Sequence, residues 1–433
     1  MIESNWLFKS IDDVYEFLES RDQYGSQPGL ERMKRLMGCL GNPEDRVYTI
    51  HIAGTNGKGS VGAYLESIIH QDRMYALHYS SPAVFHWRDV WRRFGFQLSD
   101  YYLIEAASKV YAATYFLDRM KVHPTRFEVE TAMAIYASVH SYNEYLILEA
   151  GMGGREDATN IIERPRYCVF TNISYDHTHI LGDTLTEIAT EKAGIIKPAC
   201  KAFSAEQAPE VKAVLDEKML YGKVNYVDNS AIELISQKPG ELKFRYKGLE
   251  CETSLSGLYQ MKNAALAIDI TRDMGFPDDM IVKGIKDAQW DGRFQVLSKE
   301  PYFIIDGAHN VDAIKQLAET IKSCFTNEPI NFIIGVLKDK EYKKMMEIIT
   351  PMANKIYTIT PPNARGMDGN ELAEEIKKWN VDVTYCESIE MAVNLAMDER
   401  RSTGISTVAF GSLSYLGELK ECHDNYLKKQ EIL

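Results

Sequence analysis

The sequence predicts an α/β protein built from two doubly wound domains, each with a mainly parallel sheet. Strand-like and helix-like segments alternate along most of the 433 residues, and such alternation is typical of βαβ units. The alternation restarts near residue 301, after a stretch with a different pattern. A chain of this length usually divides, because single hydrophobic cores stop growing at about 250–300 residues.

The first half of the chain predicts a helix followed by a strand–helix series. Ser10, with Asp13 three residues later, is typical of a helix start. A glycine-rich turn at 54–60 separates the first strand from a helix with apolar residues at helical spacing. The expected strands are 47–53, 145–148 and 167–173, and the expected helices include 131–139 and 185–196.

Residues 231–255 depart from this series. Leu242, Phe244 and Tyr246 alternate with polar residues, which predicts an antiparallel hairpin that could add an edge to the sheet. A second series then begins, and we place the domains at 1–296 and 297–433. Its expected strands are 302–306, 331–336, 355–359, 381–385 and 407–410.

Composition and charge exclude several classes of protein. The chain is 45% hydrophobic and 26% charged, which is typical of a globular protein. The net charge of −13 predicts that the protein does not bind nucleic acid, and the lack of a long apolar run predicts that it does not span a membrane. The first six residues do not resemble a secretory signal. Seven scattered cysteines without a Cys-x-x-Cys pair favour a reducing, cytoplasmic location.

Residues 51–60, His-Ile-Ala-Gly-Thr-Asn-Gly-Lys-Gly-Ser, are typical of a phosphate-binding loop between a strand and a helix. Glycines allow backbone N–H groups to approach phosphates, and the helix N-terminus adds partial positive charge. Lys58 can then reach the β- and γ-phosphates and Ser60 can face Mg²⁺. The strict Walker pattern is not met, since Ile52 replaces its first glycine and Gly59 precedes Ser60. A glycine-rich turn without a ligand is the alternative interpretation.

Two residues that follow strands suit a magnesium–phosphate site. Glu149 follows an apolar strand and precedes a glycine-rich loop, where a Mg²⁺ ligand is expected; a surface glutamate is the alternative. His177 lies in Asp-His-Thr-His at 176–179, but no cysteine or carboxylate cluster with zinc spacing accompanies it. Lys192, taken alone, would be a solvated helical lysine.

Motifs spread in order over nearly the whole chain resemble those of the Mur ligase superfamily, specifically folylpolyglutamate synthases and dihydrofolate synthases of the FolC type. They include Gly-Thr-Asn-Gly-Lys-Gly-Ser at 54–60, Glu-Ala-Gly-Met-Gly-Gly-Arg-Glu-Asp at 149–157, Glu-Lys-Ala-Gly-Ile at 191–195 and Asp-Gly-Ala-His-Asn at 306–310. The resemblance implies a P-loop ATP-binding domain, a Rossmann-like second domain and ATP-driven attachment of L-glutamate to a folate carboxylate through an acyl phosphate.

The resemblance also implies site residues, and it makes Lys192 a carbamylated metal ligand. Folate, L-glutamate and ATP are the expected small-molecule substrates, Mg²⁺ the expected metal, and a monomer the expected state. The implied catalytic residues are Lys58, Glu149, His177 and Lys192. The implied metal ligands are Ser81, Glu149, His177 and Lys192. The implied ATP contacts are Gly54, Thr55, Asn56, Gly57, Lys58, Gly59, Ser60, Asn263, Arg293, Asp306 and His309. The implied folate contacts are Gly29, Leu30, Thr125, Phe127, Glu128, Asp157 and Ala158.

One loop departs from the family pattern. The family's Ser-Pro-His-Leu is Ser-Pro-Ala-Val at 81–84, and its Arg-Glu-Arg-Ile is Arg-Asp-Val-Trp at 88–91. A repacked aromatic loop and an altered acceptor pocket are both open interpretations. Three hypotheses follow: a folate ligase that could also act as a dihydrofolate synthase, the same ligase chemistry on a non-folate carboxylate, and a catalytically silent nucleotide-binding paralogue. Retention of Lys58, Glu149, His177 and Lys192 together speaks against the last.

Overall fold

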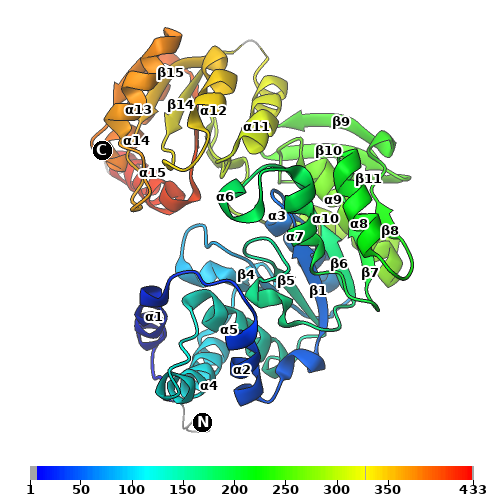
Figure 1. Ribbon diagram of the computed structural model, residues 1–433. Helices are drawn as coiled ribbons and strands as arrows, with labels where there is room; N and C mark the ends of the chain where they lie inside the picture. Colours follow the sequence, from blue (N-terminus) through cyan, green and yellow to red (C-terminus); the bar gives the residue numbers. More distant parts are fainter. Residues whose placement is uncertain (1–6, 327, 432–433) are drawn as a thin grey trace. The chain divides into compact units, whose positions relative to one another are not determined.

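The structure, a computed structural model, describes residues 7–326 and 328–431 (Figure 1). The chain divides into two compact units that are discontinuous in sequence. The first holds the chain up to Ala83, Arg88–Ser230 and Lys262–Ala288, and the second holds Val84–Trp87, Ala231–Met261 and the chain from Gln289. The prediction that no secretory signal is present concerns residues 1–6, which lie outside the described residues.

The first unit is built on one eight-stranded sheet of order β4-β3-β2-β5-β1-β6-β7-β8. The six strands β2, β5, β1, β6, β7 and β8 pair in parallel with their neighbours. Strands β3 and β4 form an antiparallel edge next to β2. The strands are β1 (Tyr48–Ala53), β2 (Ala76–Tyr79), β3 (Trp91–Arg93), β4 (Phe96–Gln97), β5 (Tyr145–Glu149), β6 (Tyr167–Phe170), β7 (Lys201–Ser204) and β8 (Val224–Tyr226).

Helices connect these strands, and the predicted start of the first helix is confirmed. Ser10 and Asp13 form a capping box, in which each side chain accepts a hydrogen bond from the other residue's backbone N–H. The helices are α1 (Ile11–Ser20), α2 (Glu31–Leu40), α3 (Lys58–Gln71), α4 (Asp100–Arg119), α5 (Arg126–His140), α6 (Thr178–Leu181), α7 (Leu185–Ala193), α8 (Pro209–Lys218), α9 (Gln260–Met274) and α10 (Asp278–Asp287).

The second unit contains two sheets. A six-stranded sheet has the order β12-β13-β17-β14-β15-β16 and is parallel apart from β12. A separate antiparallel sheet has the order β11-β10-β9. The strands are β9 (Ile232–Lys238), β10 (Glu241–Tyr246), β11 (Leu249–Thr253), β12 (Gln295–Ser298), β13 (Phe303–Ile305), β14 (Ile330–Ile334), β15 (Ala353–Thr358), β16 (Asp382–Tyr385) and β17 (Ser406–Phe410); the helices are α11 (Val311–Cys324), α12 (Tyr342–Ile349), α13 (Gly369–Ile376), α14 (Ile389–Thr403) and α15 (Leu416–Glu431).

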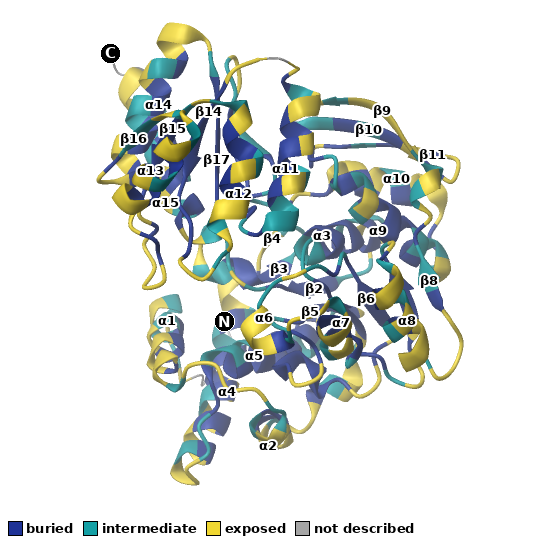
Figure 2. Ribbon diagram, turned by 45° about the horizontal axis from the view of Figure 1, so that its top comes forward, coloured by how far each residue is buried: buried dark blue, intermediate teal, exposed yellow. Residues whose placement is uncertain are grey.

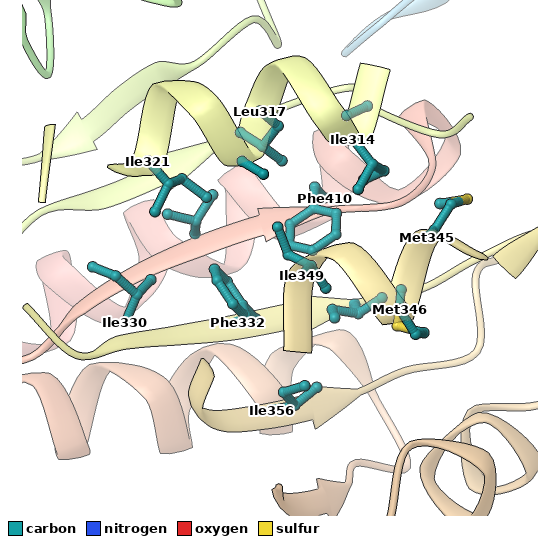
Figure 3. Packing of buried hydrophobic residues seen from close by; sticks show 14 of the residues in the cluster. Ile314, Leu317, Ile321, Ile330, Phe332, Met345, Met346, Ile349, Ile356 and Phe410 are labelled. Carbon is teal, nitrogen blue, oxygen red and sulfur yellow. The ribbon is translucent and has the colours of Figure 1, made fainter. Parts of the chain in front are cut away.

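Apolar side chains between the six-stranded sheet and its helices form the core of the second unit (Figure 3). Ile314, Leu317 and Ile321 recur at helical spacing on α11 and are buried against Phe332 of β14 and Phe410 of β17. Burying one such side chain stabilises the fold by about 1.5–3 kcal/mol. Figure 2 shows the central strands as buried, while helices such as α8 and α13 expose one face.

The predicted fold class is confirmed, and one detail of it was wrong. Residues 231–255 do not add an edge to a large sheet; they form the three-stranded sheet β9–β11. The period-two pattern predicted antiparallel pairing correctly, but it carries no information about which sheet receives the strands. The domain division at 296/297 stays a prediction. No helix in the described part of the chain is both long and apolar enough to cross a membrane.

Candidate active site

Four neighbouring strands of the first unit end at one edge of the sheet, in the order β2, β5, β1, β6. Ser81 follows β2, Glu149 ends β5, the glycine-rich loop 54–60 follows β1 and His177 follows β6. The register pairs Ile52 with Glu149. Because ligands of open α/β sheets bind outside the carboxyl ends of the strands, this edge is the candidate site.

The glycine-rich loop is held against β6 and α9. Gly54 has φ +156°, and a Cβ there would lie 1.9 Å from Thr171 Oγ1. Gly57 has φ +94°, and a Cβ there would lie 2.6 Å from Asn263 Oδ1. Both positions therefore require glycine. Asn263 lies against the loop, and its contact with ATP stays a prediction. The helix α3 begins at Lys58, so the N–H groups of its first turn lie at the end of the loop.

Two lysines converge on one carbonyl oxygen of this loop. Lys192 Nζ donates to Gly54 O at 2.9 Å, and Lys58 Nζ donates to the same oxygen at 3.3 Å. Burial, followed by the charge of Lys58, lowers the pKa of Lys192 to about 7, although Asp176 and Asp157 oppose this shift. Near pH 7 a substantial fraction of Lys192 is therefore a neutral amine.

Glu149 and its neighbours fit a magnesium ion whose ligands include phosphate oxygens as well as protein side chains. Glu149 is 3% exposed, and its Oε1 is buried without a hydrogen-bond partner among the described residues. Within the described ranges, no three His, Cys, Asp or Glu side chains gather closely enough to form a protein-only metal site. Mg²⁺ commonly takes one or two carboxylates and completes its shell with phosphate oxygens and water. Glu149, the Ser81 hydroxyl and the His177 imidazole suit that arrangement better than a closed zinc site.

His177 is the N-cap of α6 and has a left-handed backbone with φ 51°. Its N–H donates to Asp176 Oδ1 at 2.8 Å. Asp176 had no predicted role, yet its charge acts on Lys192. The position of Asp176 directly before His177 is the sequence feature that could have indicated its proximity to the site.

The predicted folate residues lie in three segments, 29–30, 125–128 and 157–158, and the first and third contact each other. Gly29 N donates to Glu156 O at 3.2 Å, which brings residues 29–30 to Asp157 and Ala158. Thr125 and Glu128 form the capping box that starts α5. Much of their polar capacity is therefore used within the protein, while Glu128 Oε1 is buried without a hydrogen-bond partner in the described part of the chain.

The departing loop is repacked around aromatic side chains. Trp91 is 1% exposed and its Nε1 donates to the Glu130 carbonyl oxygen at 3.2 Å. Its ring centroid lies 6.4 Å from that of Tyr79, which lies 6.2 Å from that of Phe127, a predicted folate residue. The first interpretation of the loop is thus confirmed for Trp91. An altered acceptor pocket stays a prediction, since this aromatic cluster reaches Phe127.

Arg293, Asp306 and His309 lie together in the second unit. Asp306 accepts hydrogen bonds from Tyr259 Oη (2.9 Å) and from the backbone N–H groups of Phe294 and Ala308 (both 2.7 Å). Burial raises the pKa of Asp306, although Arg293 and these donors oppose the shift. A Cβ at position 307 would lie 1.9 Å from Arg293 Nη1. Asp306 thus organises the turn, and the roles of all three toward ATP stay predictions.

Two further observations complete this turn. His309 Nδ1 lies 2.7 Å from Gly307 O. The Asn310 side chain caps α11 by accepting from Ala313 N at 2.9 Å. Tyr259 was missed because it lies 47 positions before Asp306, outside every motif.

His51, in β1 before the loop, predicts an acid-sensitive fold. Burial, followed by the charge of Lys197, lowers the pKa of His51 to about 3, and its Nε2 lies 2.9 Å from Thr159 Oγ1. An unfolded histidine titrates near 6.5, so below that pH the unfolded state binds more protons and stability falls. Lowering the pH from 7 to 5 should therefore reduce the free energy of unfolding by about 2 kcal/mol through this one histidine. Urea unfolding should therefore show a smaller acid loss for His51→Gln; an equal loss in both proteins would contradict this.

Comparison with known proteins gives concordant matches over most of the chain. Residues 52–271 match the Mur ligase middle domain and residues 292–413 match the Mur ligase glutamate ligase domain. The dihydrofolate synthase/folylpolyglutamate synthase of Bacillus subtilis is 32% identical over 397 residues, which are 87% of this chain and 92% of that protein.

Two similar solved structures agree with these matches. Mycobacterium tuberculosis folylpolyglutamate synthase, complexed with ADP and AMPPCP, has a TM-score of 0.86 at 25% identity and covers 96% of this chain and 99% of its own. Escherichia coli FolC, in complex with DHPP and ADP, has a TM-score of 0.82 at 26% identity and covers 97% of this chain and 99% of its own.

Proposed function

Since this chain belongs to the Mur ligase family, in its folylpolyglutamate synthase and dihydrofolate synthase branch, we propose that it uses ATP to join L-glutamate to a folate carboxylate. It is an ATP-dependent amide ligase. The observation that carries the proposal is the convergence of Lys58 and Lys192 on Gly54 O, at the sheet edge where Glu149 ends its strand. A silent nucleotide-binding paralogue would not require this arrangement.

The glycine-rich loop and the start of α3 bind the phosphates of ATP. Lys58 has its ammonium folded back onto Gly54 O and Thr55 O, at 3.3 and 3.4 Å. These are long contacts to neutral acceptors, and a phosphate oxygen is a stronger partner for an ammonium group. Lys58 therefore turns from these carbonyls to the phosphates and neutralises charge on the transferred group.

Glu149, Ser81 and His177 would hold Mg²⁺, which supplies charge neutralisation at the phosphoryl oxygens when bound. The folate carboxylate attacks the γ-phosphorus of ATP, giving an acyl phosphate and ADP. The glutamate amine then attacks the acyl carbon and phosphate leaves. The protein contributes positioning and electrostatic stabilisation and needs no covalent nucleophile of its own.

Lys192 is carbamylated in the working enzyme. A neutral amine reacts with CO₂ to give a carbamate and a proton, and the lowered pKa of Lys192 provides that amine near pH 7. The product is an anion next to Lys58 instead of a second cation. Such an anion suits a ligand of a metal ion, which the ammonium form does not.

Dihydrofolate synthesis is a second activity that the similarities favour. The relative from B. subtilis carries both names, and the E. coli structure contains DHPP. In this chain two of the three segments of predicted folate residues, 29–30 and 157–158, meet at the Gly29–Glu156 hydrogen bond. We also propose a cytoplasmic monomer; all seven cysteines are free thiols, as a reducing compartment requires.

A product mass assay tests the proposed function. The purified protein receives ATP, Mg²⁺ and L-glutamate with either tetrahydrofolate or dihydropteroate as acceptor. We expect the mass of tetrahydrofolate to rise by one glutamate residue, with one ADP released for each glutamate added. A gain on dihydropteroate as well would establish the second activity. No gain on either acceptor, with ATP binding intact, would contradict folate as the substrate and favour another carboxylate.

A further inference from the structure

A histidine lies between two buried carboxylates behind the candidate metal ligand. His78 Nε2 is 3.8 Å from Glu149 Oε1, and His78 Nδ1 is 3.8 Å from Glu66 Oε2. His78 is fully buried, and the two glutamates are only 4% and 3% exposed. Each ring nitrogen thus faces a different carboxylate at ion-pair distance, and this alignment has no role in the mechanism above.

The sheet brings these side chains together. His78 of β2 is the register partner of Ile147 in the neighbouring parallel strand β5. Because side chains alternate along a strand, Glu149 lies on the same face of β5 as Ile147, one step closer to the carboxyl end. Glu66 reaches the imidazole from α3.

The surrounding backbone makes room for the imidazole and fixes Glu66. Gly62 of α3 lies over the ring, and a Cβ there would be 2.3 Å from His78 Nε2 and 2.4 Å from His78 Cε1. The Gly95 N–H donates to Glu66 Oε1 at 2.9 Å, so one oxygen of this carboxylate is held while the other faces His78. Burying two carboxylates around one imidazole is costly unless the groups are paired. The surrounding residues therefore hold the imidazole and the two carboxylates in this arrangement.

We propose that His78 is a positioning residue, which holds Glu149 Oε1 inside the protein so that the other carboxylate oxygen is presented to the metal ion of MgATP. Partners behind a metal ligand orient it, and their removal typically lowers metal affinity 10–100-fold. Glu66 in turn keeps the imidazole facing Glu149. This inference rests on the proposed function, since it assigns Glu149 to the metal.

The test measures metal binding as well as turnover. Mn²⁺ is titrated into the protein with AMPPCP, and free Mn²⁺ is followed by electron paramagnetic resonance. His78→Leu should raise the dissociation constant for Mn²⁺ about 10-fold and raise KM for MgATP. His78→Gln, whose amide N–H can take the place of the ring Nε2 beside Glu149, should bind Mn²⁺ within a few-fold of the wild type. A purely structural role would not distinguish these two variants in affinity.

Two further variants keep the test decisive. Gly62→Ala should displace the imidazole and weaken Mn²⁺ binding, and it should add little to His78→Leu, because both changes disrupt the same contact. His423→Leu removes an equally buried imidazole from the second unit and should leave Mn²⁺ affinity unchanged. Wild-type affinity in folded His78→Leu, or in Gly62→Ala if His78→Leu does not fold, would overturn the proposal. A wild-type protein that binds no Mn²⁺–AMPPCP would instead contradict the proposed function.

Discussion

Replacing Lys192 by alanine should lower the rate of glutamate ligation by on the order of 10³-fold, the scale at which enzymes depend on a charge placed at a transferring phosphoryl group. The substitution removes the proposed carbamate and the contact with Gly54 O. Acetate or propionate, which supply a small carboxylate, should restore part of the lost rate. The measurement is ADP release coupled to the folate mass gain, with and without added carboxylate.

The fold of this variant should survive. Lys192 is buried (5% exposed), and burying its charge, as an ammonium or as a carbamate, costs stability. The thermal midpoint of the variant should therefore equal or exceed that of the wild type. Lys201→Ala, which breaks an exposed ion pair with Asp273 in the same unit, is the matched control and should keep full activity. Near-normal turnover of Lys192→Ala would remove this lysine from the catalytic residues.

The pH dependence of carbamylation follows from the same lysine. Only the neutral amine reacts with CO₂, and the pKa of about 7 means that this form is lost as the pH falls below 7. At a fixed concentration of dissolved CO₂, reactivation of CO₂-depleted enzyme should therefore become slower from pH 8 to pH 6. Carbon-13-labelled bicarbonate should give a carbamate resonance in the wild type that Lys192→Ala lacks. A rate that rises as the pH falls would contradict this assignment.

Replacing Glu149 by glutamine should reduce turnover by on the order of 10²–10³-fold while preserving the shape of the side chain. The change removes the negative charge proposed to hold the metal ion and leaves an amide facing His78. The concentration of Mg²⁺ required for half-maximal activity should rise as well. Steady-state kinetics over a range of Mg²⁺ concentrations at saturating ATP would measure both effects.

A glutamate outside the site provides the comparison for this variant. Glu163 lies in the same unit, 4.0 Å from Lys197, and its side chain is 66% exposed. Glu163→Gln should keep the wild-type rate and the wild-type Mg²⁺ requirement. If Glu149→Gln behaved in the same way, Glu149 would have no role at the metal ion.

Five strands of the six-stranded sheet, three of the eight-stranded sheet and the glycine-rich loop could be predicted from the sequence because their signals are local. The loop residues are contiguous, and each buried parallel strand is a short apolar run next to an amphipathic helix. Glu149 could be placed for the same reason, since it directly ends such a run. These signals set the order of the elements, and the parallel pairing of strands then brings their carboxyl ends to one edge.

The rest of the site depends on contacts between residues far apart in sequence. Lys192 was a solvated helical lysine by pattern alone, and its burial against Gly54 emerges only when α7 packs on the loop. His78 occupies one position in a short apolar strand, and its two carboxylate partners come from other elements. Tyr259 supports Asp306 from outside every motif. Local periodicity does not contain such pairings.

The second unit takes one short segment from early in the chain, and this has a consequence during synthesis. Val84 and Phe85 pack against Gly292 and Gly417, which are made much later. At about 5–20 residues per second, a ribosome needs on the order of tens of seconds to add the intervening chain. For that time Phe85 lacks its final packing partners. A chain cut short before residue 417 would leave this segment without one of those partners and more open to proteases.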